Sequence, residues 1–230
     1  MANAESEMKV KEAVKLIENL GTTESDLNFK AEVLKSFLSE RNLDYIPRPS
    51  GIEQQKFILF YSLFSFIKGG ENYSFHTLKH FPQGPVYCDV FTLANKTVYV
   101  NKLATQKIQL DKEIIDMTLL LMYLFGKDGI SKLTHSLDFW KNTKRGYDCA
   151  VAEKGLTEND KLRLEKLYAE LQETNEKFIL FQNYNNKVLL IQKEYYKEIT
   201  DNFLAELNKY DETTLEPLYV YLIEGELVID

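Results

Sequence analysis

Two almost entirely apolar stretches, residues 57–67 and 117–125, constrain the fold of this 230-residue chain most. A helix that is apolar on every side is buried rather than half-exposed. Both stretches fall far short of the roughly 20 residues that a membrane-spanning helix needs. We therefore predict two buried central helices, one ending at Gly69 and the other capped by Asp111 and followed by Gly126.

Amphipathic patterns predict helices around this pair, within residues 8–20, 25–38, 130–137, 157–174 and 193–210. Ser25 or Asp26 is the expected cap of the second of these. Thr157 and Asp160 form a capping box at the start of the fourth.

Strands are expected mainly late in the chain. Residues 178–182 and 187–192 flank an asparagine-rich turn, and residues 219–223 and 226–229 flank Glu224-Gly225. Both patterns are typical of β-hairpins. Residues 97–100 read as a further short strand, and the segment after Pro85 as a short helix. Pro82, Gly84 and Pro85 predict an irregular loop.

These elements predict a mainly α fold with a minor β component. It is a compact helical domain around two buried central helices, with short β-hairpins toward the C-terminus. Pro47 and Pro49 indicate a break. We expect an N-terminal helical extension over residues 1–45, a helical domain over 46–174, and an acidic α+β extension over 175–230 packed on that domain.

Charge and cysteine content narrow the functional classes. The chain has 35 acidic and 28 basic residues, which gives a formal net charge of −7. This negative charge disfavours general binding to nucleic acid. Residues 146–230 hold 9 basic and 18 acidic residues, which suits either a basic partner or a well-solvated surface. Two cysteines are too few for a disulfide framework. With no apolar signal core at the N-terminus, we expect a cytoplasmic protein that does not enter a membrane.

Several groups of residues could carry chemistry, and each also has a structural explanation. His76 and His80 share one face if their segment is helical, with Cys88 as the nearest soft metal ligand. A thiol enzyme requires Cys88 or Cys149 beside a histidine. The default explanations are a loop-anchoring hydrogen bond for the histidines and burial for the thiols. We therefore expect no catalytic residue, no metal and no cofactor.

Two patches have unusual local character. The first is the buried helix 57–67 followed by HFPQGPVY, and the second is LTHSLDFWK, residues 133–141, which holds the single tryptophan. The structural explanation of the second patch is a helix-ending turn inserted into the core by Trp140, with Asp138 forming the turn. The alternative is an enzyme built around His135 with Asp138 or Cys149.

In this order the two patches resemble the Panacea domain, also described as the SocA-like antitoxin or the phage-associated GepA-like domain. Its buried opening helix is matched by GIEQQKFILFYSLFSFIKGG, its GPV turn continues here into Asp89, Val90 and Phe91, and its long apolar helix is matched by residues 111–125. Phe139 stands where the family often has proline. The resemblance covers about residues 46–170, and its signature residues are Gly84, Pro85, Val86, Thr134, His135, Asp138 and Trp140.

The resemblance implies an antitoxin that neutralises a cognate toxin by direct protein–protein binding, with the signature residues acting as structural or partner-binding groups. The alternative is a phage or mobile-element protein that binds and inhibits a host defence or replication protein, or a protease adaptor. DNA binding for autorepression through the N-terminal helices is a further alternative. If the resemblance holds, Trp140 is mostly buried near helix 57–67, with the Gly84–Val86 turn close to it.

Overall fold

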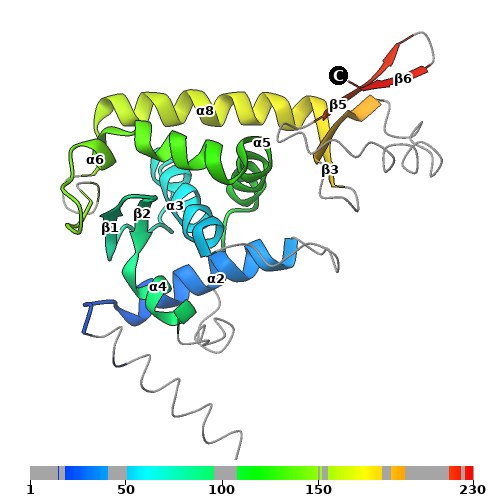
Figure 1. The fold of residues 1–230 in the computed structure, drawn as a ribbon. Helices are drawn as coiled ribbons and strands as arrows, with labels where there is room; N and C mark the ends of the chain where they lie inside the picture. Colours follow the sequence, from blue (N-terminus) through cyan, green and yellow to red (C-terminus); the bar gives the residue numbers. More distant parts are fainter. Residues whose placement is uncertain are drawn as a thin grey trace, which may run out of the picture.

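The computed structural model describes residues 15, 19–40, 51–95, 108–149, 151, 155–182, 188–194, 218–223 and 226–229 (Figure 1). The helices are α2 (Glu24–Glu40), α3 (Gly51–Ile67), α4 (Cys88–Asn95), α5 (Lys112–Ser136), α6 (Asp138–Lys141) and α8 (Glu158–Lys177). The strands are β1 (Leu78–Phe81), β2 (Gly84–Tyr87), β3 (Phe178–Gln182), β4 (Val188–Gln192), β5 (Leu218–Ile223) and β6 (Glu226–Ile229). The fold is mainly α with a minor β component, as the sequence predicts.

Helices α3 and α5 are the two central helices. Every residue of α3 from Gln55 to Ser65 is buried, because its surface is apolar on nearly all sides. Asp111 caps α5 as predicted, accepting the backbone N–H groups of Glu113 at 2.9 Å and Ile114 at 3.3 Å. Gly126 leaves the helical conformation at φ 57°, so α5 is two helical segments joined at a kink.

Helices α2 and α8 complete the core around this pair (Figure 1). Phe37 of α2 stacks on Phe57 of α3 with ring centroids 4.3 Å apart, so α2 belongs to the same core as the central helices. Its N-terminal contact comes from Thr23, whose hydroxyl accepts the N–H of Asp26 at 3.1 Å, and not from Ser25 or Asp26 as predicted. The predicted cap of α8 is confirmed, because Thr157 accepts the N–H of Asp160.

The segment predicted as an irregular loop forms the β1–β2 hairpin instead. Strands β1 and β2 pair antiparallel, with Phe81 opposite Gly84 and His80 opposite Pro85. Pro85 has no N–H to donate, and a two-stranded hairpin accommodates that loss because each strand has an unpaired edge. The short helix expected after Pro85 is α4, which begins at Cys88.

Both predicted C-terminal hairpins are confirmed, as β3–β4 and β5–β6. They join through a parallel pairing of β4 with β5 into one sheet of order β3-β4-β5-β6. The sheet lies at the C-terminal end of α8, and the β1–β2 hairpin lies at the opposite end of the molecule (Figure 1).

Several predictions concern residues outside the described ranges: the break at Pro47 and Pro49, the strand at 97–100, and nearly all of the helices predicted at 8–20 and 193–210. Among the helices that the structure describes, none combines the length and the apolar character needed to cross a membrane.

Candidate functional site

Most of the signature residues lie where the β1–β2 hairpin packs against α3 and α5, whereas Asp138 contacts Asn159 of α8. Gly84 opens β2 at a φ of 102°, in the region that favours glycine. A Cβ atom on Gly84 would overlap the Nζ of Lys56 from α3 and would lie 3.1 Å from the Thr134 hydroxyl of α5. Glycine is therefore required here for both its backbone conformation and its lack of a side chain.

Thr134 and Pro85 complete the surroundings of Lys56. The buried hydroxyl of Thr134 is satisfied within α5, because it lies 2.8 Å from the carbonyl oxygen of Ser131 and 3.1 Å from that of Ile130. The carbonyl oxygen of Pro85 accepts a hydrogen bond from Lys56 Nζ at 3.3 Å. The adjacent residues Gly84 and Pro85, together with the distant Thr134, thus lie around one buried ammonium group.

Three aromatic rings, those of His80, His135 and Trp140, form a stack near the ammonium group of Lys56. The His135 ring lies on the Trp140 indole with centroids 4.1 Å apart, and the His80 ring lies on the same indole at 4.4 Å. His80 is the cross-strand partner of Pro85, so the hairpin reaches Trp140 as expected. Nitrogens His80 Nδ1, His135 Nε2 and Trp140 Nε1 have no hydrogen-bond partner in the described structure, so ring contact holds the stack.

Trp140 is mostly buried, as predicted, and packs against the hydrophobic core. The fully buried side chain of α6 is Phe139, at 1 % exposure. Phe139 is thus buried more completely than Trp140, the residue that the sequence predicted to anchor this turn in the core. This leaves the tryptophan at the boundary between core and surface, against the two histidines.

Asp138 has a different role from the predicted turn former. The cap of α6 comes from buried Asp160 in the first turn of α8, which accepts the N–H of Asp138 at 2.7 Å and that of Phe139 at 3.0 Å. Asp138 itself accepts from Asn159 Nδ2 at 2.6 Å. A proline at position 139 would have no N–H to donate. Phenylalanine at this position therefore permits the hydrogen bond from the Phe139 N–H to Asp160.

The titratable groups of the site are shifted mainly by burial. Desolvation lowers the pKa of Lys56 to about 7, and Cys149 opposes this slightly. Desolvation also lowers the pKa of His135, with further contributions from Lys56 and His80. At neutral pH the imidazole is therefore predominantly neutral, and the amine is close to half-protonated.

The structure contains a second buried lysine, on helix α2. Lys30 of α2 forms an ion pair with Asp89 of α4 at 2.7 Å and donates to the carbonyl oxygen of His76 at 2.9 Å. The side chains of Lys30 and Asp89 are 1 % and 0 % exposed. Thr22 donates to the same carboxylate at 3.1 Å. Asp89, which follows the GPV turn, thus ties α2 to α4, the helix that directly follows the hairpin.

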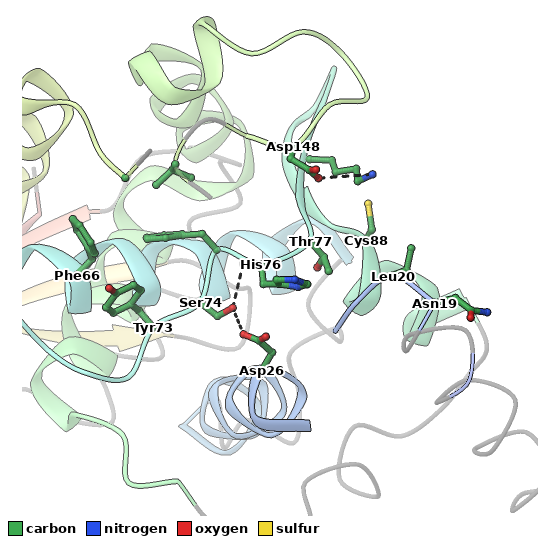
Figure 2. Close-up of a pocket in the computed structure, with 14 residues that line it drawn as sticks. Asn19, Leu20, Asp26, Phe66, Tyr73, Ser74, His76, Thr77, Cys88 and Asp148 are labelled. Carbon is green, nitrogen blue, oxygen red and sulfur yellow. Dashed lines mark hydrogen bonds and ion pairs between the residues drawn. The ribbon is translucent and has the colours of Figure 1, made fainter. Parts of the chain in front are cut away.

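A cavity of about 780 Å³ lies beside this ion pair, because His76 and Thr77, which Lys30 contacts, are among the residues that line it (Figure 2). Aromatic side chains, among them Phe66 and Tyr73, line one end, and both polar and apolar residues, Leu20 among them, line the rest. The Ser74 hydroxyl donates to Asp26, and Lys79 lies 3.8 Å from Asp148, so these polar side chains have partners within the chain.

The described residues do not assemble the metal or thiol sites that the sequence suggests. No group of three or more metal-ligating side chains occurs among them. His76 lies in a turn before β1 and His80 within β1, so the two share no helical face. Burial raises the pKa of the Cys88 thiol, and it raises that of Cys149 to about 12, so neither is an activated thiolate at neutral pH.

Sequence reasoning missed Lys30, Lys56 and Asp160. Lys30 directly follows Phe29, and Lys56 directly precedes Phe57, the first residue of the apolar stretch. The pattern of an amphipathic helix therefore predicts that both lysine side chains lie in solvent at the border of an apolar face. Asp160 was assigned to the capping box of its own helix. Its bonds to α6 depend on a contact across 22 positions, which local patterns do not encode.

The chain was compared with family models, curated proteins and solved structures, and none of them matches it.

Proposed function

We propose that this chain is an antitoxin-like protein of the Panacea type, which neutralises a cognate toxin by direct protein–protein binding in the cytoplasm rather than by catalysis. Its binding surface is the aromatic face, defined as Phe81, Phe91 and Tyr147 around the β1–β2 hairpin. The proposal depends on the resemblance of the signature residues, and the meeting of most of them at one hairpin supports that resemblance.

The observation that carries the proposal is the exposure of these three aromatic side chains beside the signature residues. Phe81 is the cross-strand partner of Gly84, Phe91 lines a pocket with Pro85 and Val86, and the carbonyl oxygen of Tyr147 accepts the N–H of His80. Exposed aromatic side chains on a rigid support are typical anchors of protein interfaces.

Charge supports a basic toxin surface as the partner. Residues 146–230 carry twice as many acidic as basic residues, although the chain before them is close to neutral. Complementary charge accelerates encounter between two proteins and disfavours wrong partners. The aromatic face then supplies contact area, and the acidic region supplies long-range attraction.

The test is co-expression of the full chain with the product of the adjacent gene, scored by cell growth and by co-purification. Growth that depends on this chain, together with a stable complex, is the expected result. A neighbouring product that is not toxic and forms no complex contradicts the antitoxin role. A protein captured from host lysate would then favour the alternative, an inhibitor of a host protein or a protease adaptor.

A further inference from the structure

The two buried lysines differ in one respect that points to a ligand. Lys30 has the carboxylate of Asp89 at 2.7 Å. Lys56 is 2 % exposed, and no carboxylate oxygen of the described ranges lies within 4.0 Å of its Nζ. Its hydrogen bond to the Pro85 carbonyl oxygen is long, at 3.3 Å. A buried ammonium group without a counter-ion is unfavourable, so burial favours the neutral amine of Lys56, and an anion beside Nζ would stabilise the ammonium form.

Lys56 also lines a pocket of about 280 Å³ between α3, β2 and α4. Ile52, Pro85, Val86 and Phe91 give this pocket a largely apolar wall. The side chain of Gln55 is occupied, because it exchanges two hydrogen bonds with the backbone of Tyr87 at 2.7 and 3.3 Å. Lys56 is therefore the single ionisable side chain among the described residues that line the pocket.

We propose that this pocket binds a carboxylate carried on an apolar body, with Lys56 as its counter-ion. The carboxylate of the ligand pairs with the Lys56 ammonium group, as the Asp89 carboxylate pairs with Lys30. The apolar body of the ligand covers Ile52 and Phe91. Two sources offer this chemistry: a small apolar carboxylic acid, and the C-terminal carboxylate of a peptide that ends in an apolar residue. The inference goes beyond the proposed antitoxin role and does not depend on it.

Such binding has a distinctive pH dependence. A bound carboxylate favours the ammonium form of Lys56, so above the free pKa of about 7 binding must take up a proton. Affinity is then expected to fall about tenfold per pH unit above pH 7.5. His135 of α5 and Cys149 also face Lys56. Neither titrates strongly between pH 7.5 and 9, because the pKa of His135 is lowered and that of Cys149 is raised to about 12.

The experiment is calorimetric titration of the full chain with hexanoate and phenylacetate, and with hexanamide and phenylacetamide as uncharged controls. Acetyl-Gly-Gly-Leu with a free and with an amidated C-terminus tests the peptide source. We expect at least one carboxylate to bind tenfold or more tightly than its amide, and the probe class that binds identifies the source. Equal binding of acid and amide, or no binding of any carboxylate at pH 6.5 to 7.5, overturns the proposal.

The variant Lys56→Met keeps the length and packing of the side chain and removes the charge. We expect it to lose at least tenfold in affinity for the carboxylate, whereas Lys79→Met, a half-exposed lysine outside the pocket, binds as the parent does. Unchanged binding by Lys56→Met overturns the proposal. If Lys56→Met does not fold, the acid–amide comparison and the pH profile of binding by the parent chain test the proposal instead.

Discussion

The carboxylate of Asp160 accepts the backbone N–H of Asp138 at 2.7 Å and so ties the start of α8 to the start of α6. The same carboxylate accepts the N–H of Phe139, the buried residue of α6. A side chain of one helix thus caps another and holds Trp140 against the β1–β2 hairpin.

Replacing Asp160 by alanine removes both bonds and leaves one buried and one part-buried N–H group without its partner. We expect a loss of about 3 kcal/mol in the free energy of unfolding, measured by denaturant titration. The fluorescence of Trp140, the single tryptophan, should also change in the native state, because α6 loses its cap. Thr157→Ala, which removes an ordinary helix cap, is the control and should cost about 1 kcal/mol.

Gly84→Ala tests the close packing of the hairpin on Lys56. The new Cβ overlaps Lys56 Nζ and forces a left-handed conformation on alanine. Gly146→Ala is a matched control, because Gly146 has a φ of 81° with nothing within 4 Å. We expect Gly146→Ala to cost about 1–2 kcal/mol from conformation alone and Gly84→Ala clearly more. Equal losses in unfolding free energy would show that Lys56 moves aside without cost, which contradicts close packing of the hairpin on this lysine.

Asp89→Asn tests the buried ion pair with Lys30. The substitution keeps the shape of the side chain and leaves the ammonium group of Lys30 buried without its counter-charge. We expect the free energy of unfolding to fall by about 3–5 kcal/mol. Asp148→Asn breaks the exposed pair with Lys79 and should change it by about 1 kcal/mol at most. A loss for Asp89→Asn as small as that of the control contradicts the ion pair.

The lowered pKa of Lys56 predicts how stability depends on pH. Between pH 7 and about 10 the unfolded chain holds a proton on this lysine that the folded chain has released. Stability of the parent relative to Lys56→Met therefore rises with pH, by up to about 1.4 kcal/mol per unit. Unfolding titrations of both chains at pH 6, 7, 8 and 9 measure this difference. A difference that is constant over this range contradicts the lowered pKa.

The main helices could be predicted from the sequence because their signals are local. The apolar stretch 57–67 indicates a buried helix by itself, and Asp111 and Thr157 mark helix starts through contacts within three residues. The two C-terminal hairpins follow from alternation around short turns. Their parallel union through β4 and β5 depends on a long-range pairing that no local pattern indicates.

The candidate site was predictable only in part. The signature residues were identified, and the structure brings Gly84, Pro85, Thr134 and Trp140 to one place. The β1–β2 hairpin was missed because glycine and two prolines outweigh strand signals in a four-residue segment. Lys56 was missed because nothing local shows that an ammonium group will be desolvated by the packing of α3, β2 and α5.

The central claim is that the aromatic face binds a toxin. The most direct measurement is growth of cells that co-express the product of the adjacent gene with the parent chain, with Phe81→Ser/Phe91→Ser, or with Leu162→Ser, each checked for folding by circular dichroism. Leu162 is a matched control because it is 65 % exposed on α8, comparable with Phe91 at 56 %.

The account predicts that the parent and Leu162→Ser restore growth and co-purify with the toxin, and that the folded double variant loses both properties. Restored growth and an intact complex with the double variant would contradict the claim that the aromatic face binds the toxin.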